Sequence, residues 1–400
     1  MSLGNSRIVL SSAALLLGGT LGCGNDSPAN VDARDQDIVD AARGSDGAMP
    51  DANTEACEGI GLPASATTPY EDLLCHRGGF GGAVTGGAGG ELIVIDNLND
   101  GSFLTALEQQ GPKWIRFSVS GTIQYTGEIE ITSNTTIDGR GADIVISSDS
   151  DADPEFHFYG ADKENLIVHN ITFKNIGSPS TASGVGLAIN NGAHNVWVDH
   201  CTFTRNHDDA ITVGHAGTDI TVSHVRYEDQ YLGGVYGWSP DHTEDVAMKV
   251  TFHHNSFDGS NVTTPYPNKM IRTPAIRYGQ FHVYNNYINA WGSGGTVSYN
   301  EGELRVENNV YDTPGGNLEP PIKTTDGYIC QLGNLLKSSS VFLTGVEDAI
   351  TEEIVDGEGS PWYDCTQVFD APYEYALSVA NDALATRIQA MAGRMDQPMW

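Results

Sequence analysis

The sequence predicts an all-β protein, a right-handed single-stranded parallel β-helix in which short strands stack as the coils of a solenoid. The main observation is internal repetition, because six segments share alternating apolar positions, a polar His or Asn, and a second short apolar run. Their starts lie 30, 24, 30, 31 and 23 residues apart. The 47 glycines and a charged fraction of only 18% indicate many tight turns and few long surface helices. The six copies are 165–173, 195–203, 219–227, 249–257, 280–288 and 303–311.

Two further copies extend this series. A shorter copy begins at Asn134, and a degenerate one begins at Tyr328. The strands are too short for a sandwich, and each coil of a solenoid covers the apolar edge of its neighbour. Together the copies predict a parallel β-helix of about eight coils.

The N-terminal residues 1–23 predict an export signal. Arg7 precedes an apolar run, 8–21, that is too short for a comfortable membrane span and is typical of a signal-peptide core. The run ends in Leu21, Gly22 and Cys23, which resemble the lipobox of a bacterial lipoprotein. We therefore expect an exported protein, either extracellular or held at the cell surface or outer membrane by a membrane tether on lipidated Cys23. The alternative is ordinary cleavage nearby with an unmodified thiol.

Residues 24–56 predict an acidic disordered linker. They hold eight Asp and Glu residues against Arg34 and Arg43, and they contain no aromatic residue. Such a segment buries too little apolar surface to order itself. Globular composition begins near Cys57, so 57–400 is the expected folded domain.

The net charge of -32 and the pI near 4.4 argue against nucleic acid and anionic membrane surfaces as partners, because both attract basic proteins. We expect no nucleic-acid partner and a monomer. Export makes disulfides feasible. The local pairings Cys57–Cys75 and Cys330–Cys365 are favoured, although spacing alone does not fix connectivity. Cys201 lies in a strand pattern and is expected to be a buried thiol.

The remaining elements follow in order. The glycine-rich run 78–90 precedes a strand and lacks the Gly-Lys-Ser/Thr of a phosphate loop, which argues against nucleotide binding. Residues 102–110 predict a short helix with Ser102 as N-cap, and 114–123 alternate as a strand. Near the C-terminus, 374–395 predict a helix whose apolar face packs on the solenoid.

A column of polar side chains occupies equivalent positions at the strand ends of the repeats. Stacked Asn and His side chains can satisfy one another and the turn backbone, so this column is expected to be scaffold, with His200 its best catalytic candidate. The next column predicts an asparagine ladder of Asn255, Asn286 and Asn309. The first column contains Asn170, His200, His224, His254, Asn285 and Asn308.

Two arginines stand between the fourth and fifth copies. Arg272 and Arg277 lie five residues apart with Pro274 between them, in a chain that holds only 20 Lys and Arg residues. On a regular strand they would face opposite ways unless a bulge or bend resets the register. The segment is expected to be the catalytic strand, and the plain alternative for Arg272 is a structural salt bridge.

Several motifs in order resemble the pectate lyases of polysaccharide lyase family 1, over roughly residues 75–395. They are the glycine-rich opening, TIDGRGA at 136–142, NVWVDHC at 195–201, ITVSH at 220–224, and VTFHHN followed by RTPAIR at 272–277 and FHVYNN. The resemblance implies a right-handed parallel β-helix with an N-terminal helical cap. It also implies cleavage of (1,4)-linked galacturonan, an acidic polysaccharide, by β-elimination to 4,5-unsaturated products, usually with Ca²⁺.

By motif, Arg272 matches the family's catalytic base and Arg277 its carboxylate-binding arginine. Removing a proton beside a carboxylate builds negative charge there, which a guanidinium or a cation stabilises. Asp199 and His200 belong to the WVDH element and, with Lys269, are expected to bind substrate, although Asp199 could instead support the turn. Trp197 is expected to fill the coil interior.

The sequence departs from the family at the calcium and lysine positions. The calcium carboxylates map onto Gly186, Asp208 and Thr212, so only Asp208 remains, with Asp209 beside it as the expected weakened Ca²⁺ site. The substrate-contacting lysine maps onto Leu232, and Lys249, Lys269 or Arg205 could replace it in space. Two alternatives therefore stay open: a calcium-independent pectin lyase acting on methyl-esterified pectin, and a catalytically inactive glycan-binding β-helix.

Overall fold

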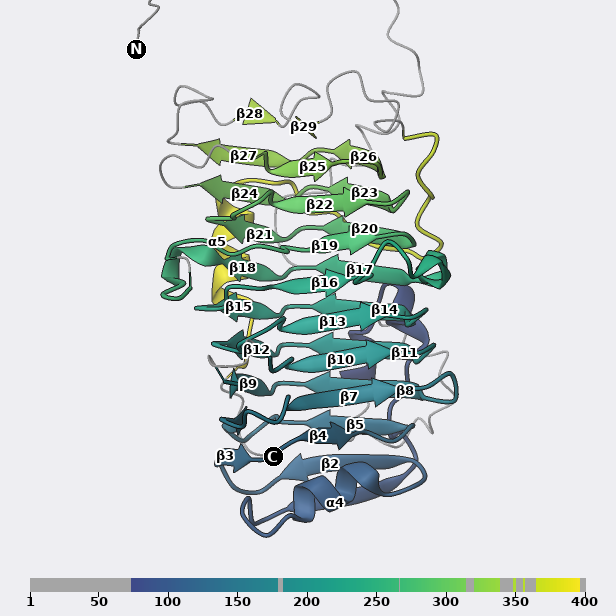
Figure 1. The fold of residues 1–400 in the computed structure, drawn as a ribbon, viewed down its shortest axis with the longest axis vertical. Coiled ribbons are helices and arrows are strands. Elements are labelled where there is room, and N and C mark those ends of the chain that lie inside the picture. Colours follow the sequence, from purple (N-terminus) through teal and green to yellow (C-terminus); the bar gives the residue numbers. More distant parts are fainter. Residues whose placement is uncertain are drawn as a thin grey trace, which may run out of the picture. The chain divides into compact units, whose positions relative to one another are not determined.

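The computed structural model describes residues 73–178, 183–265, 267–313, 320–338, 348–349, 355–356 and 365–395. Their strands form three sheets, and successive coils contribute one strand to each (Figure 1). The expected signal peptide, lipobox, linker and Cys57 lie outside the described residues. No helix within the described part of the chain is long and apolar enough to span a membrane.

Sheets A and B hold ten strands each and sheet C holds nine. Sheet A contains β1 (Glu91–Ile95), β2 (Lys113–Phe117), β5 (Thr135–Asp138), β8 (Glu164–His169), β11 (His194–Asp199), β14 (Thr218–Ser223), β17 (Lys249–His253), β20 (Gln280–Tyr284), β23 (Glu303–Glu307) and β26 (Tyr328–Leu332). Sheet B contains β3 (Gly121–Gln124), β6 (Ile144–Ser148), β9 (Thr172–Ile176), β12 (Thr202–Thr204), β15 (Arg226–Glu228), β18 (Ser256–Asp258), β21 (Tyr287–Asn289), β24 (Val310–Thr313), β27 (Leu335–Ser338) and β28 (Asp348–Ala349). Sheet C contains β4 (Glu128–Glu130), β7 (Glu155–Tyr159), β10 (Leu187–Asn190), β13 (Ile211–Gly214), β16 (Gly234–Tyr236), β19 (Ala275–Arg277), β22 (Thr296–Tyr299), β25 (Ile322–Thr324) and β29 (Val355–Asp356).

This architecture confirms the predicted right-handed parallel β-helix, since the strands within each sheet pair in parallel apart from the short β27–β28 pairing. The expected count of about eight coils was too low. The repeat comparison began at Asn134 and so omitted β1 and β2, which are the first two strands of sheet A. Their side chains lack the His or Asn at the strand end by which the other copies were recognised.

The interior of the coils is filled by alternate side chains that stack along the solenoid. In sheet B, the ring of Phe203 lies 4.9 Å from Phe173 and 5.8 Å from Tyr227, and Tyr227 lies 4.3 Å from Phe257. Residues paired across parallel strands stand directly above one another, so equal ring positions in successive coils produce this ladder. The apolar core is therefore continuous from coil to coil.

The predicted polar column lies at the turns from sheet A to sheet B. Its members have left-handed backbones, with φ between 49° and 62°, a region that Asn and His tolerate better than most residues. The asparagine ladder beside it is confirmed. Asn255 Nδ2 donates to Asn286 Oδ1, Asn286 to Asn309, and Asn309 to Asn334, each at 2.9 Å.

The glycine-rich run has a packing role on the outer face of sheet A. It contains a short 3-10 helix, η1 (Phe80–Ala83), and the backbone N–H groups of Gly81 and Gly87 donate to the hydroxyl oxygens of Thr221 and Thr136 at 2.9 Å. A Cβ on Gly87 would lie 1.8 Å from the carbonyl oxygen of Lys113, so only glycine permits this close approach. The segment covers Trp197, which packs against Leu73, Leu74 and Val84 outside the coils. The prediction that Trp197 fills the interior was wrong.

An N-terminal helix closes one end of the solenoid, as the resemblance implies. Helix α4 (Ser102–Glu108) buries Phe103, Ala106 and Leu107 in the coil core. Its N-cap is Gly101, with φ 79°, so Ser102 is the first helical residue and not the cap.

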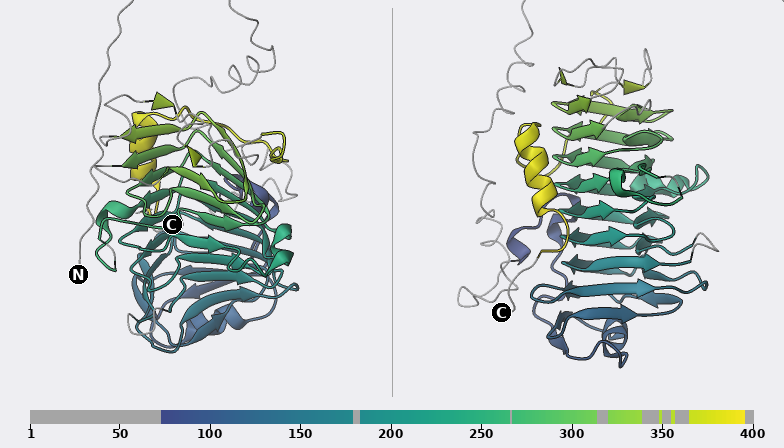
Figure 2. Two further views of the ribbon diagram at one scale, coloured as in Figure 1. Left: turned by 45° about the horizontal axis from the view of Figure 1, so that its top comes forward. Right: turned by 90° about the vertical axis from the view of Figure 1, so that its left-hand side faces the viewer.

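The C-terminal helix packs on the solenoid but is shorter than predicted. Helix α5 (Asp382–Met391) begins after the N-cap Asn381 and buries Leu384, Ala385 and Ile388. It lies beside sheet B (Figure 2). The residues before it are not helical. There the side chain of Asn285 binds the backbone of Ser378: its Nδ2 donates to the Ser378 carbonyl oxygen at 2.7 Å, and its Oδ1 accepts from the Ser378 N–H at 2.8 Å.

The two cysteine predictions that concern described residues are confirmed. Cys330 and Cys365 form a disulfide with a Cα–Cα distance of 4.4 Å. Cys201 is a buried free thiol at the turn that follows β11. Burial raises its pKa to about 12, so it is inert as a nucleophile.

Candidate active site

A cavity of about 500 Å³ lies on the outer face of sheet C. Its wall combines charged groups of both signs with aromatic rings. The charged residues are Glu155, Asp208, Asp209, Arg272 and Arg277, and the aromatic residues are Tyr159, Trp238 and Tyr299.

Both predicted arginines line this one cavity, although they are an odd number of residues apart. Arg272 has a left-handed backbone, with φ 60°, and β19 begins only at Ala275. The bend resets the register that a regular strand would have imposed. The sequence therefore identified the right segment, and the local backbone conformation brings its two cations together.

Arg272 forms an ion pair with Asp209 across the cavity wall. The distance from Arg272 Nη1 to Asp209 Oδ2 is 2.5 Å, and Asp209 is only 2% exposed. The other carboxylate oxygen, Oδ1, is buried and has no hydrogen-bond partner among the described residues. The structural salt bridge considered above for Arg272 therefore exists, and it lies inside the cavity.

Burial raises the pKa of Asp209 to about 7. Arg272 opposes this shift, and neighbouring Asp208 adds to it. Burial also raises the pKa of Asp208, which Arg272 only partly offsets and which Glu155 reinforces. The positive charge of Arg272 does not offset the burial and mutual repulsion of these carboxylates, so the cavity favours the binding of an added cation.

This raised pKa predicts how the metal-free protein responds to pH. The folded protein binds a proton at Asp209 more tightly than the unfolded chain, whose Asp pKa is about 3.9. The contribution of Asp209 to the free energy of unfolding is therefore expected to fall by about 2–4 kcal/mol as pH rises from about 4 to 7, and to level off above 7. Carboxylates with a lowered pKa, such as Asp138 and Glu307, contribute in the opposite direction, so the contribution of Asp209 is the difference from its asparagine variant. Chemical denaturation across this range measures the change. Asp209→Asn should remove this part of the slope, and an unchanged slope would contradict the assignment.

Arg277 is held at the mouth of the cavity by backbone and ring contacts. Its Nη1 donates to the carbonyl oxygens of Gly237 at 2.8 Å and Trp238 at 3.3 Å, and its guanidinium lies 5.2 Å from the centre of the Tyr299 ring. The remaining N–H groups form a planar fork suited to a carboxylate.

Sequence reasoning missed Glu155 and the aromatic residues of the cavity. The alternation Glu155-Phe156-His157-Phe158-Tyr159 carries the signal, because the two Phe side chains are fully buried in the core and their neighbours must face outward. The TIDGRGA motif at 136–142 lies on the same coil but ends before β7. The ring of Trp238 is 39% exposed, so it can pack on the apolar face of a sugar.

Other predicted site residues lie elsewhere. Asp199 and His200 lie where sheet A ends, and Lys269 is exposed in the loop after the 3-10 helix η3 (Gly259–Asn261). None of these three lines the cavity. Of the residues considered as replacements for the missing lysine, Arg205 is paired with Asp229 and Lys249 begins β17 in sheet A. None of Arg205, Lys249 and Lys269 lines the cavity that holds the two arginines.

Gly186 and Thr212, which stand where the family has calcium-binding carboxylates, differ in the space available for a larger side chain. Thr212 lines the cavity. At Gly186, a Cβ would lie 2.6 Å from the carbonyl oxygen of Ala210 and 2.8 Å from the ring of Phe203, so a carboxylate side chain does not fit there without a backbone shift.

The fold and the site define a class: a parallel β-helix protein whose lateral cavity combines guanidinium groups, carboxylates and aromatic rings, the groups that recognise a charged sugar. Residues 76–393 match the pectate lyase family, and the chain belongs to that family. The chain is similar to Probable pectate lyase 16 of Arabidopsis thaliana, with 31% identity over 269 residues that cover 59% of this chain and 63% of the relative. It is also similar to a pectate lyase of Lilium longiflorum, with 32% identity over 246 residues, 55% of this chain and 53% of the relative.

Solved structures share the fold. The major allergen of cedar pollen, Jun a 1, aligns with a TM-score of 0.60 and 19% identity over 86% of this chain and 99% of its own. A variant of the Bacillus subtilis pectate lyase aligns with a TM-score of 0.60 and 19% identity over 80% of this chain and 97% of its own. The chain thus spans less than two thirds of the two curated relatives described, and nearly the whole of the two solved structures.

Proposed function

We propose that the protein is a polysaccharide lyase that cleaves (1,4)-linked galacturonan by β-elimination. The observation that carries this proposal is the placement of Arg272 and Arg277 in one cavity with Glu155, Asp208 and Asp209. Membership of the pectate lyase family supports it. The substrate is an acidic polysaccharide, and we propose that the protein acts on it as an exported monomer.

In this reaction the C5–H bond of a uronate breaks and its electron pair forms the C4=C5 double bond. The C4–O bond to the leaving sugar breaks, and the departing oxygen takes up a proton. Arg272 is the proposed base for the C5 proton, and Arg277 is the proposed partner of the uronate carboxylate, where negative charge develops. Arg272 is bound to Asp209 in an ion pair, so the base needs that carboxylate to be drawn away before it can reach the C5 proton.

Calcium fits this requirement. Glu155, Asp208 and Asp209 are the residues that would hold it, because oxygen ligands suit Ca²⁺ and Asp209 Oδ1 has no partner among the described residues. A bound Ca²⁺ would supply positive charge beside the substrate carboxylate. The proposed metal residues therefore extend the sequence-predicted pair, Asp208 and Asp209, by Glu155.

The proposal is tested by the ultraviolet absorbance of the unsaturated product. Purified protein is assayed at alkaline pH on polygalacturonate and on highly methylated pectin, each with Ca²⁺ or with a chelator. Product from polygalacturonate that the chelator abolishes is the expected result. Chelator-resistant product from methylated pectin would favour the calcium-independent pectin lyase, which the poor fit of a carboxylate at Gly186 recommends as second candidate. Glycan binding without product would favour a catalytically inactive protein.

Restoring a family carboxylate should strengthen calcium binding. Thr212→Asp adds a charged oxygen ligand to the cavity wall, and we expect the dissociation constant for Ca²⁺ to fall roughly tenfold. Because Thr212 is buried, the variant should be less thermally stable without Ca²⁺ and regain stability with it. Titration calorimetry and melting curves measure both effects. Thr122→Asp, which adds the same charge at an exposed position in sheet B, is the control, and equal Ca²⁺ affinity in the two variants would contradict the placement.

A further inference from the structure

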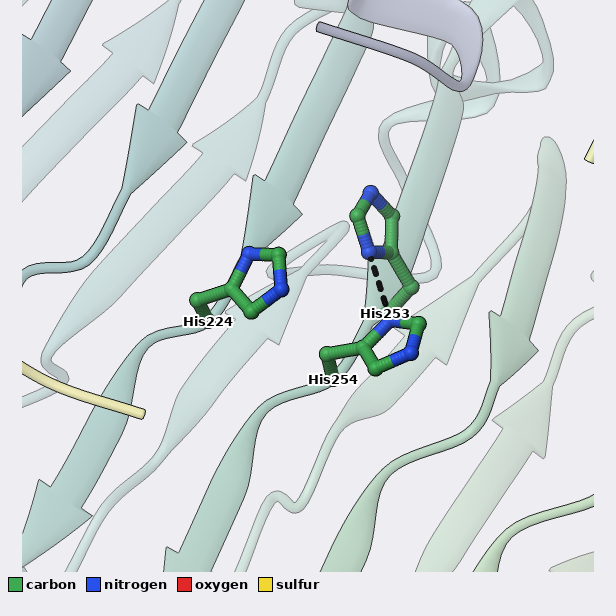
Figure 3. A group of neighbouring side chains, drawn as sticks. All are labelled: His224, His253 and His254. Atoms are coloured by element: carbon green, nitrogen blue, oxygen red, sulfur yellow. Dashed lines mark hydrogen bonds between the residues drawn. The ribbon is translucent and has the colours of Figure 1, made fainter. Parts of the chain in front are cut away.

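A second cluster of functional side chains lies outside the cavity, where sheet A turns into sheet B. It consists of His224, His253 and His254, which we call the histidine cluster. One ring nitrogen of each lies within 4.8 Å of those of the other two, and Figure 3 shows the three rings converging. None of the three lines the cavity on sheet C.

The backbones of two adjacent coils fix these rings. His253 ends β17, while His224 and His254 occupy equivalent left-handed turn positions with φ 49° and 56°. The rings of His224 and His254 are stacked with centres 5.2 Å apart, and His253 is nearly perpendicular to both. The three nitrogens are therefore preorganised.

Asp199 determines which nitrogen of His224 is free. Its Oδ1 accepts from Ser223 Oγ at 2.6 Å and lies 3.0 Å from His224 Nδ1, while its Oδ2 lies 2.7 Å from His200 Nδ1 and 3.0 Å from His169 Nδ1. Ser223 Oγ and three imidazole nitrogens surround the two oxygens of Asp199, so the carboxylate is the acceptor of these contacts. His224 therefore carries its proton on Nδ1.

The other nitrogen of His224, Nε2, is left unprotonated. It is buried and has no hydrogen-bond partner among the described residues, and the side chain as a whole is only 15% exposed. A histidine that donates one ring N–H to a carboxylate and keeps the other nitrogen free is the usual arrangement of a metal ligand. The neighbouring cluster of His169, Asp199 and His200 does not offer three free ligand atoms, because the oxygens of Asp199 are already occupied.

His253 and His254 supply two more nitrogens. Their Nδ1 atoms lie 3.0 Å apart, so in the metal-free protein they share one proton. Two imidazole nitrogens bound to one tetrahedral Zn²⁺ at about 2.0–2.1 Å lie about 3.3 Å apart, so a small movement and release of that proton suffice.

We propose that His224, His253 and His254 form a binding site for a divalent transition metal of the Zn²⁺ type, with water as a further ligand and Asp199 orienting His224. Three imidazoles select Zn²⁺, Co²⁺, Ni²⁺ or Cu²⁺ over Ca²⁺. The site is structural, because it joins two coils beneath the C-terminal segment, whose Gly393 N–H donates to the carbonyl oxygen of His224 at 2.7 Å. It is independent of the proposed lyase reaction.

The charges around the site act in opposite directions. Asp199 favours a bound dication, whereas the half-buried Arg387 of α5 opposes positive charge at His254. The variant Arg387→Gln should therefore bind the metal more tightly than the unchanged protein. A gain in affinity is a result that a damaged fold does not produce.

The experiment titrates tag-free, chelator-treated full-length protein with Co²⁺, whose visible absorption reports its ligands, and measures bound Zn²⁺ by elemental analysis after dialysis. We expect one metal per chain. His254→Asn should weaken binding at least tenfold while preserving the fold, because Asn285 and Asn308 occupy the equivalent turn positions. The matched control, His200→Asn, should bind within a few-fold of the unchanged protein.

Three outcomes would overturn the proposal. They are the absence of stoichiometric metal in the unchanged protein, equal binding by His254→Asn, and loss of binding in His200→Asn alone. The last would place the metal on His169, Asp199 and His200. Since these readouts are metal content and spectrum, they are independent of whether the protein cleaves galacturonan.

Discussion

Replacing Arg272 by lysine is expected to lower the turnover number on polygalacturonate by about 100-fold or more, with the fold unchanged. Lysine keeps the charge but loses the planar group that contacts Asp209 at 2.5 Å. Its shorter reach and different donor geometry displace the base from the C5 proton, and such displacement is costly in a positioned reaction. The rate of unsaturated product formation, with matched melting curves, measures the effect.

The control for this substitution is Arg205→Lys. Arg205 is also paired with an aspartate, Asp229, but lies outside the cavity and is largely exposed. Its variant should retain full activity. If Arg272→Lys retained activity within about threefold, Arg272 would be only a structural partner of Asp209, and the base would have to be sought elsewhere in the cavity.

The fold was predictable because its sequence pattern is periodic. Equivalent positions in successive coils have the same surroundings and so favour the same residue types, which makes the polar column and the asparagine ladder at Asn255, Asn286 and Asn309 visible in the sequence. The prediction that was wrong concerns the start of the C-terminal helix. The helix predicted from residue 374 starts at Asp382, because Asn285 binds the backbone N–H and carbonyl oxygen of Ser378 and occupies the groups that a helix would pair. Helical periodicity cannot anticipate a hydrogen bond from a residue 93 positions away.

The site was predictable in part. Arg272 and Arg277 were found by motif, whereas Glu155 was missed because it lies in β7, after the end of the TIDGRGA motif (136–142) of the same coil. Asp199 and His200 were assigned to substrate by motif, yet they lie at the corner of sheets A and B. A solenoid has three faces, and a motif does not say which face its polar residues occupy. Only the sheet in which a residue lies decides whether it reaches the cavity.

Replacing Asp209 by asparagine is expected to lower activity on polygalacturonate by about 100-fold and to weaken its dependence on Ca²⁺. Asp209 is the most buried carboxylate of the cavity, and its free Oδ1 is the strongest candidate calcium ligand there. Asparagine keeps the size of the side chain and removes its charge. Product formation is measured across Ca²⁺ concentrations, with Asp229→Asn, the same substitution at an ion pair outside the cavity, as control.

The direction of the change separates two roles of Asp209. If Asp209 only restrained Arg272 in an ion pair, its removal would free the guanidinium, and activity would rise. If Asp209 holds calcium, activity falls and added Ca²⁺ no longer restores it. Higher activity that resists a chelator would therefore contradict the calcium assignment and favour the pectin-directed alternative. The two roles share one side chain because its oxygens face different partners: Oδ2 is bound to Arg272, and Oδ1 is left for a cation.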